Sequence, residues 1–252
     1  MIASLPMYDR AETAAANDRL WALIRDALRA GDVAAPEALT RTGDLWDHWR
    51  DPALVLSQTC GLPYRARLHG AVTLLATPDY GVEGCAPGHY RSVLVVRADD
   101  PRDALPAFAG ARLAVNDALS QSGWGAVWAH AAAAGVPLAP VGPTGGHRLS
   151  ALAVAEGRAD IAAIDAVTWR LIVRHDALAT ALRILDHTEP TPGLPWIAAA
   201  GADADRMRPA LAEAVAALDA ADRETLGLKG LAVIDADAYR ALPVPPAPAW
   251  TA

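Results

Sequence analysis

The sequence of residues Leu113–Trp124, LAVNDALSQSGW, is the clearest junction between a predicted strand and a predicted helix. Its first three residues are apolar and predict the end of a buried strand. Asn116 and Asp117 interrupt that apolar run, and Ser120–Gly123 then places hydroxyl and amide groups where the next helix, predicted over Ser122–Ala134, begins. A strand that ends in polar residues and leads into a helix is the repeating unit of an α/β fold.

The same alternation extends outward from this junction in both directions. Further strands are predicted at Ile2–Leu5, Leu54–Leu56, Val72–Thr77, Ser92–Arg97, Asp160–Asp165, Leu182–Leu185 and Pro195–Ala199, and further helices at Asn17–Leu28, Leu45–Arg50, Leu149–Glu156, Val167–Val173 and Met207–Leu218. Strands and helices that alternate at these intervals predict an α/β protein with a mainly parallel sheet. The proline-rich stretch after Leu242 predicts an extended arm.

Length and charge limit the classes of function. The chain has 252 residues, of which 53% are hydrophobic, and this is enough for one large domain or two lobes. A disordered chain is excluded by the same figure. The 22 basic and 29 acidic residues give a net charge of −7, which argues against nucleic acid as a partner. No segment has the roughly 18 consecutive apolar residues of a membrane span, so membrane insertion is not expected.

The helix start at Ser120–Gly123 is the strongest candidate for a binding site. The first backbone N–H groups of a helix have no partner inside the helix, and the helix dipole is positive at that end. The Ser120 and Ser122 hydroxyls, the Gln121 amide and these N–H groups could form a small socket for an oxyanion. The alternative, that Ser120 or Ser122 is only an N-cap, stays open at this point.

Several other polar side chains follow predicted strands. Ser57 and Gln58 directly follow one strand, and Tyr64 comes shortly after them. Tyr8 lies beyond the first strand, and Tyr90 precedes another. Ligands of open α/β sheets bind outside the carboxyl ends of the strands, so these side chains are candidate ligand contacts. A lone tyrosine in a loop is nevertheless more often a packing residue.

Two further candidates are His147 and Asp165. His147 follows Gly145-Gly146 at a predicted helix start, where its ring could donate to an anion. Asp165 ends a short strand, and it either caps the following helix or offers a carboxylate to a cationic group of a ligand. Ser122, His147 and Asp165 can be drawn as a catalytic triad, but no G-x-S-x-G elbow surrounds a serine, so no catalytic residue is assigned.

Cofactors and metals have no support in the sequence. The histidines show neither H-x-x-x-H nor H-E-x-x-H spacing, and two cysteines are too few for a four-thiolate zinc site. No G-x-G-x-x-G follows a strand, and no phosphate-binding G-x-x-x-x-G-K-[ST] loop occurs. We therefore expect no cofactor and no metal.

Taken in order, these motifs resemble the phosphate, phosphite and phosphonate (PhnD-like) substrate-binding proteins of ABC transporters. The resemblance is carried by Tyr8, Ser57-Gln58-Thr59-Cys60-Gly61-x-Pro63-Tyr64, Gly88-x-Tyr90-Arg91-Ser92, Asn116 with Ser120-Gln121-Ser122-Gly123, Gly146-His147, the segment from Val154 to Asp165, and the segment from Leu228 to Tyr239. It covers about residues 1–242.

The resemblance implies a two-lobed α/β fold of the type 2 periplasmic-binding-protein kind, with a two-stranded hinge and a ligand cleft between the lobes. Residues 1–92 with 190–252 would form lobe one, and residues 93–189 would form lobe two. Ligand-binding roles would fall on Tyr8, Ser57, Gln58, Tyr64, Tyr90, Ser120, Gln121, Ser122, His147 and Asp165. A disulfide between Cys60 and Cys85 would require an oxidising compartment.

The function implied is binding of a small anionic or zwitterionic ligand and its delivery to an ABC transporter permease, by a protein that is more a binder than an enzyme and is expected to be monomeric. Gln121 stands where phosphonate binders often have threonine, which leaves the ligand open. The alternative is a cytoplasmic enzyme on the same fold, of the menaquinone or thiamine-pyrimidine biosynthesis type. The protein would be periplasmic if a leader has been removed and cytoplasmic if Met1 is the native start.

Overall fold

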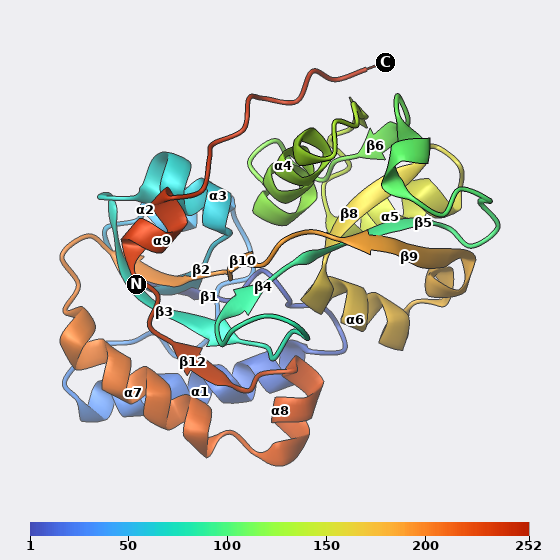
Figure 1. Ribbon diagram of the computed structural model, residues 1–252. Helices are drawn as coiled ribbons and strands as arrows, with labels where there is room; N and C mark the ends of the chain where they lie inside the picture. Colours follow the sequence, from blue (N-terminus) through green and yellow to red (C-terminus); the bar gives the residue numbers. More distant parts are fainter. Residues whose placement is uncertain (252) are drawn as a thin grey trace. The chain divides into compact units, whose positions relative to one another are not determined.

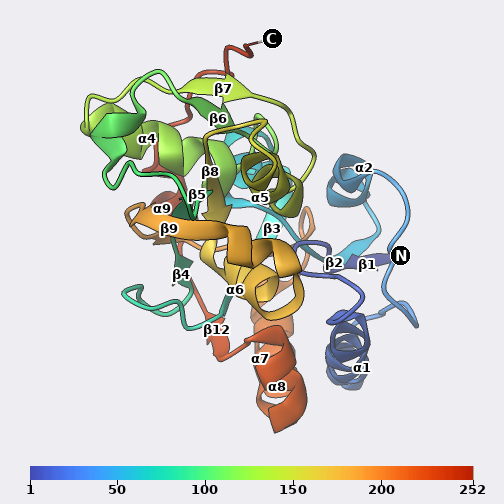
Figure 2. The same cartoon turned by 90° about the vertical axis from the view of Figure 1, so that its right-hand side faces the viewer.

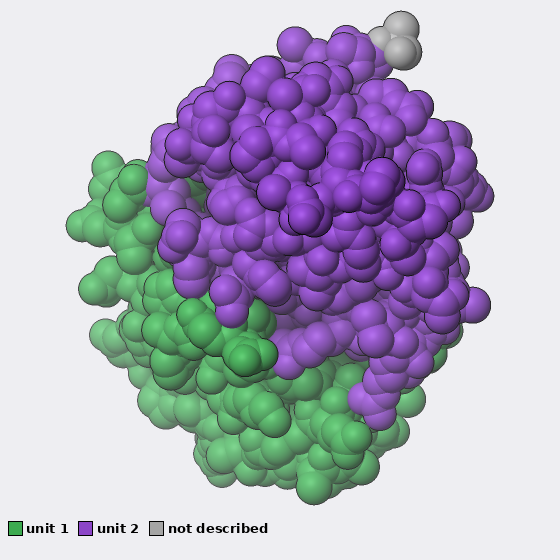
Figure 3. All heavy atoms as spheres, turned by 45° about the vertical axis from the view of Figure 1, so that its right-hand side comes forward, with its two compact units in different colours: residues 1–89, 192–241 green, residues 90–191, 242–252 purple. Residues whose placement is uncertain are grey.

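The computed structural model describes residues 1–251, which divide into two compact units. Unit 1 comprises residues 1–89 and 192–241, and unit 2 comprises residues 90–191 and 242–252 (Figure 3). The chain therefore passes between the units three times. Two of these passages are the short strands β4 (His89–Tyr90) and β10 (Thr191–Pro192), which pair with each other in a two-stranded sheet.

Unit 1 is built on a five-stranded sheet. In spatial order its strands are β1 (Ile2–Ser4), β2 (Leu54–Gln58), β11 (Trp196–Ala199), β3 (Val72–Asp79) and β12 (Gly230–Ala232). β1 and β2 run parallel, whereas β11 runs antiparallel to both of its neighbours.

The alternation of side chains along β11 shows how unit 1 is layered. Trp196 and Ala198 belong to one buried cluster, and Ile197 between them belongs to another. The first cluster packs under α1 (Ala14–Ala30), α7 (Ala204–Ala217) and α8 (Ala220–Leu226). The second packs under α2 (Leu45–Arg50), the π-helical turn η1 (Tyr64–Leu68) and α9 (Ala236–Arg240). α3 (Gly61–Pro63) leads directly into η1, and Figure 1 shows α2, α3 and α9 on the same side of the sheet. Unit 1 is thus a sheet between two helical layers.

Unit 2 repeats this plan with a second five-stranded sheet. Its spatial order is β7 (Ala139–Val141), β6 (Arg112–Ala114), β8 (Ile161–Asp165), β5 (Ser92–Arg97) and β9 (Leu182–His187). Alternate residues of β5, Leu94 and Val96, pack with Phe108, Trp124 and Val127 in one buried cluster.

Helices complete both faces of the unit 2 sheet. They are the 3₁₀ turn η2 (Leu105–Phe108), the π-helical turn η3 (Gln121–Gly125), α4 (Ala126–Ala133), α5 (His147–Ala155), α6 (Ala166–His175) and the 3₁₀ turn η4 (Ala177–Ala181). η3 continues directly into α4, and α5 and α6 pack against each other and against β5 and β8 (Figure 2).

The predicted mixed α/β class is confirmed, but the predicted mainly parallel sheet is wrong. β11 is antiparallel to β2 and β3, and β5 is antiparallel to β8 and β9. Both strands enter their sheet directly after a passage between the units, so no βαβ crossover dictates their direction. Local alternation of strands and helices cannot reveal such an arrangement.

Residues 242–252 were expected to belong to lobe one, but the described part of this tail contacts unit 2. It has no regular secondary structure through Thr251, in agreement with an extended arm. The Trp124 indole N–H donates to the carbonyl of Pro246 over 2.9 Å, and the Thr251 N–H donates to the carbonyl of Pro140 over 2.9 Å. Among residues 1–251, no helix is long and apolar enough to cross a membrane.

Candidate functional site

The start of η3 in unit 2 has the capped geometry that its sequence predicts. The Ser120 Oγ accepts from the backbone N–H of Gly123 over 3.0 Å, which makes Ser120 the N-cap. A Cβ on Gly123 would lie 1.8 Å from the Oδ1 atom of Asn116, so glycine is what allows Asn116 to approach. One of the two roles left open for Ser120, the N-cap, is therefore confirmed, and its hydroxyl hydrogen remains available for donation.

His147 meets Ser122 at the same place. The Oγ of Ser122 and the Nε2 of His147 are 2.8 Å apart. The loop before His147 is tied to the end of β6, because Thr144 N–H donates to the carbonyl of Val115 and Gly145 N–H donates to that of Asn116, each over 3.0 Å. Two helix starts are thus held against one strand end.

Asp165 is the N-cap of α6, which is one of the two roles predicted for it. Its Oδ1 accepts from the N–H groups of Val167 and Thr168 over 2.9 and 3.0 Å, and its Oδ2 accepts from the Thr168 hydroxyl over 2.5 Å. The same Oδ2 lies 3.7 Å from the Nε2 of His147. Asp165 therefore caps a helix and places negative charge beside the imidazole.

We call Asn116, Ser120, Gln121, Ser122, His147 and Asp165 the oxyanion socket. Burial lowers the pKa of His147, and the neighbouring Asp165 carboxylate and the Ala163 carbonyl oppose that shift. The His147 side chain is only 13% exposed and that of Asp165 only 4%. The socket thus offers hydroxyls, an amide, a largely neutral imidazole and helix N–H groups, so hydrogen bonds rather than an ion pair would hold a ligand.

The socket does not have the geometry of a serine-hydrolase triad. In such a triad the serine contacts one ring nitrogen of histidine and the carboxylate contacts the other. Here the Ser122 hydroxyl and the Asp165 carboxylate both face Nε2 of His147. The imidazole cannot take a proton from Ser122 while Asp165 orients it through the opposite nitrogen, so these three residues do not form a catalytic triad.

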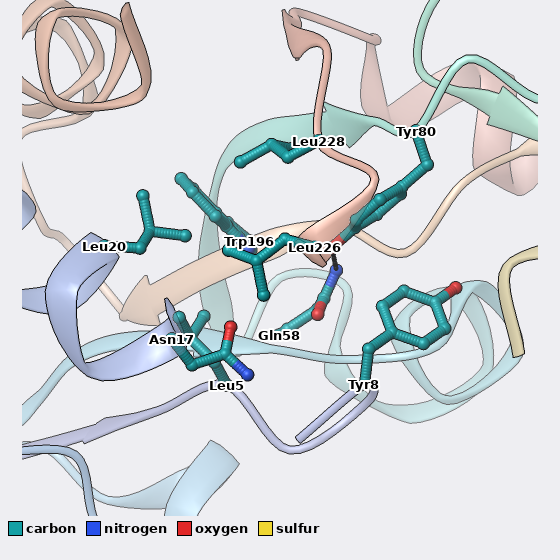
Figure 4. A pocket seen from close by; sticks show the side chains of 9 residues that line it. All are labelled: Leu5, Tyr8, Asn17, Leu20, Gln58, Tyr80, Trp196, Leu226 and Leu228. Atoms are coloured by element: carbon teal, nitrogen blue, oxygen red, sulfur yellow. Dashed lines mark hydrogen bonds between the residues drawn. The ribbon is translucent and has the colours of Figure 1, made fainter. Parts of the chain in front are cut away.

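Unit 1 contains a separate pocket with about 310 Å³ of empty space, counting its open mouth (Figure 4). Its lining is mainly apolar and aromatic: Leu5, Tyr8, Asn17, Leu20, Gln58, Tyr80, Trp196, Leu226 and Leu228. The rings of Tyr8 and Tyr80 meet edge to face with centroids 4.9 Å apart, and the Gln58 amide donates to the Tyr80 hydroxyl over 3.4 Å. None of the charged side chains within residues 1–251 lines this pocket.

One donor in this pocket stands out. The indole Nε1 of Trp196 is buried and has no hydrogen-bond partner among the described residues, although the residue is only 1% exposed. Buried donors are normally satisfied by protein, water or ligand. This nitrogen is enclosed by the core, and the mainly apolar and aromatic lining of the pocket suits an uncharged group.

Three other predicted site residues, Ser57, Tyr64 and Tyr90, are buried in the structure. The Ser57 Oγ lies 2.7 Å from that of Ser4 in the buried sheet. Tyr64 is 2% exposed and packs edge to face on Tyr239 with centroids 5.2 Å apart, away from the pocket lining. Tyr90 is the buried second residue of β4.

Cys60 and Cys85 are half-buried thiols in the structure. The disulfide between them stays a prediction from the resemblance. Among residues 1–251, no group of three or more histidine, cysteine, aspartate or glutamate side chains is arranged to hold a metal ion.

Sequence reasoning did not assign site roles to Thr168, Tyr80 or Trp196. Thr168 could have been found, because it follows the Asp165 cap by three residues, the spacing of a capping interaction. Tyr80 follows directly on β3 and satisfies the same strand-end rule that selected Tyr8. Trp196 carries no such signal, because it reads as an ordinary core residue of its strand.

Comparisons with known proteins agree with this architecture. A family model described as "ABC transporter, phosphonate, periplasmic substrate-binding protein" matches residues 2–239. No curated protein sequence matches the chain significantly.

Three solved structures share the fold. PhnD1 from Prochlorococcus marinus, in complex with methylphosphonate, is 17% identical with a TM-score of 0.72, and 95% of this chain and 94% of that chain are covered. XAC2383 from Xanthomonas citri, bound to ATP, is 17% identical with a TM-score of 0.68, and 96% of this chain and 94% of that chain are covered. A binding protein component of an ABC phosphonate transporter from Pseudomonas aeruginosa is 17% identical with a TM-score of 0.67, and 94% of this chain and 82% of that chain are covered.

These structures establish a two-lobed α/β binding-protein fold, and the family assignment rests on the sequence match over residues 2–239. That match contains every residue of the oxyanion socket and both strands that connect the two units. The chain belongs to the family of periplasmic phosphonate-binding proteins of ABC transporters.

Proposed function

We propose that the protein binds a small oxyanion with a phosphonate-like or phosphate-like head in the oxyanion socket of unit 2. The observation that carries this proposal is the 2.8 Å contact between the Ser122 hydroxyl and His147 Nε2 at two adjoining helix starts. Neutral donors at helix starts suit an anion. Ser120, Gln121, Ser122 and His147 would contact the ligand.

Asp165 would act on the ligand indirectly. Both of its oxygens already accept hydrogen bonds at the start of α6. Its negative charge near His147 disfavours a doubly charged anion, so a head that carries one proton, or a monoanion, is the better fit. This sets a preference for singly charged ligands.

We also propose that Tyr8 and Gln58, which line the pocket of unit 1, contact the ligand. Tyr8, Tyr80 and Trp196 provide aromatic faces there, and Gln58 provides an amide. Ser57, Tyr64 and Tyr90 would then support the site through packing. Units 1 and 2 would be the two lobes, and closure on the ligand would occur at β4 and β10.

Family membership supports a periplasmic location and a permease as the partner that receives the ligand. We propose in addition that the protein is a monomer in solution. Fractionation of cells that produce the native gene tests the location. Light scattering coupled to gel filtration tests the monomer. Copurification of a tagged permease with the wild-type protein, and its loss when the transported ligand is withheld, tests the partner.

The binding experiment is a thermal-shift panel of phosphate, phosphite, methylphosphonate, 2-aminoethylphosphonate, methanesulfonate and acetate, followed by calorimetric titration of each ligand that shifts the melting temperature. A ligand present at about 100 times its Kd stabilises the folded state by about 2.7 kcal/mol. His147→Gln should abolish most of the shift, while His175→Gln on the exposed end of α6 should retain it. No shift with any phosphorus oxyanion would overturn the proposal.

A further inference from the structure

The C-terminal tail, residues 242–251, contacts two of the segments that form the oxyanion socket. One segment is η3, which carries Gln121 and Ser122. The other is the stretch from β7 to the start of α5, which ends at His147. Both segments and the tail belong to unit 2.

The contact with η3 is made by Trp124. Its indole N–H donates to the carbonyl of Pro246 over 2.9 Å, and the side chain is 7% exposed. Trp124 follows Ser122 by two positions within the same short helix, so the orientation of its indole is coupled to that of the socket backbone.

The contact with the second segment is made by the last described residues. The N–H and the hydroxyl of Thr251 both donate to the carbonyl of Pro140, over 2.9 and 3.1 Å. The ring of Trp250 lies against Gly142, where an added Cβ would stand 3.4 Å from it. Gly142 begins the loop that leads into His147.

The composition of the tail favours an ordered, extended conformation. Pro245 and Pro248 are buried, and proline fixes φ and lowers the entropy that ordering an extended segment costs. An extended segment without internal hydrogen bonds can be held only by such contacts. This segment is therefore anchored on both socket segments rather than loosely attached.

We propose that the tail is a positioning element for the socket: it holds η3 and the loop before His147 in register, so that Ser122 and His147 stay within hydrogen-bond distance of each other. Trp124 is the positioning residue through which it acts on η3. The inference deepens the proposed function, because it assigns residues outside the ligand contacts to ligand affinity.

The test compares the wild-type protein with a chain ended at Ala241 and with Trp124→Phe, which removes the indole donor and part of the ring. Trp128→Phe on α4 is the control, because it removes the same atoms from a partly buried tryptophan that packs on the same cluster. Hydrogen exchange of the ligand-free proteins is measured for residues 116–126 and 142–148. We expect exchange there to rise on the order of 3- to 10-fold in the first two variants, as for a lost hydrogen bond, and to stay unchanged in Trp128→Phe.

Calorimetric titration with phosphate and methylphosphonate then gives the second readout, well below the melting temperature of every variant. Affinity should fall by a similar factor in Trp124→Phe and by more in the truncated chain. A synthetic peptide of residues 242–252 should restore it in trans, whereas a scrambled peptide should not. A purely structural role would lower the melting temperature without this pattern.

Unchanged exchange in both socket segments would overturn the inference, whatever the ligand data show. Failure of the wild-type protein to bind any probe would overturn the proposed function and leave the exchange result to decide the inference. If the truncated chain does not fold, Trp124→Phe against Trp128→Phe decides it alone.

Discussion

At the residue scale, His147 is the group on which the socket depends most. It lies 2.8 Å from the Ser122 Oγ and 3.7 Å from the Asp165 Oδ2. Burial lowers its pKa and outweighs the opposing effect of Asp165, so the ring is neutral at neutral pH. A neutral ring can donate one hydrogen bond to a ligand without adding a charge that the ligand must match.

The lowered pKa of His147 predicts how stability depends on pH. Below the unfolded value near 6.5, the unfolded chain binds a proton that the folded chain resists, so stability falls as the pH drops toward the folded pKa. His147→Gln should therefore reduce the loss of stability between pH 7 and 5, whereas His175→Gln should leave it as in the wild type. Urea unfolding in an anion-poor buffer measures this, and equal slopes in all three proteins would contradict it.

Glycine at position 123 is required by geometry. A Cβ there would meet the Asn116 side chain at 1.8 Å, so Gly123→Ala should cost about 1–3 kcal/mol of stability and displace Ser122 from His147. Gly146→Ala is the matched control, because no atom lies within 4 Å of its Cβ position and its extended backbone suits alanine. Melting curves and phosphate titration of both variants test this; equal loss in the two would refute the steric explanation.

At the element scale, α9 is fixed to the unit 1 sheet by one buried hydrogen bond. The Tyr239 hydroxyl lies 2.6 Å from the Thr77 Oγ1 of β3, and both residues are fully buried. Burial raises the pKa of Tyr239, so the phenol stays protonated and can donate.

Removing one partner of this hydrogen bond should lower the stability of the protein more than removing both partners. Tyr239→Phe leaves the Thr77 hydroxyl buried without its partner and should cost about 1–3 kcal/mol. Thr77→Val with Tyr239→Phe should recover part of that loss. A double-mutant cycle by chemical denaturation measures the coupling, and strict additivity of the two single changes would count against the pair.

Elements also show where sequence reasoning works and where it does not. Long periodic segments such as α1 and α7 were predicted, because their apolar spacing is a local property. β7 was missed because it is three residues long and contains Pro140, and β12 because it spans only Gly230–Ala232. The antiparallel direction of β5 and β11 depends on partners that lie far away in the chain, which no local pattern records.

The same distinction holds for the site. Ser120, Ser122, His147 and Asp165 could be selected as candidates because strand ends and helix starts leave local signals, and the structure brings these four residues together in unit 2. The pocket of unit 1 was found only in part. Its lining combines α1, β2, β11 and the segment before β12, so residues such as Trp196 become neighbours of Tyr8 only on folding.

At the scale of the whole molecule, the division into two units connected at β4 and β10 is what allows the proposed closure. A ligand shifts that equilibrium only by its difference in affinity for the two states. Saturating ligand should therefore lower the radius of gyration in small-angle X-ray scattering. A bound ligand that leaves the radius unchanged would exclude closure.

The binding of an oxyanion by the socket is tested most directly by a crystal structure of the protein grown with methylphosphonate. We predict that the phosphonate head lies within about 2.7–3.2 Å of the Ser122 Oγ and of the His147 Nε2. Anomalous scattering from phosphorus would locate it independently of the refined atoms. A phosphonate found away from the helix starts of unit 2, with Ser122 and His147 still hydrogen-bonded to each other, would contradict binding of the oxyanion by the socket.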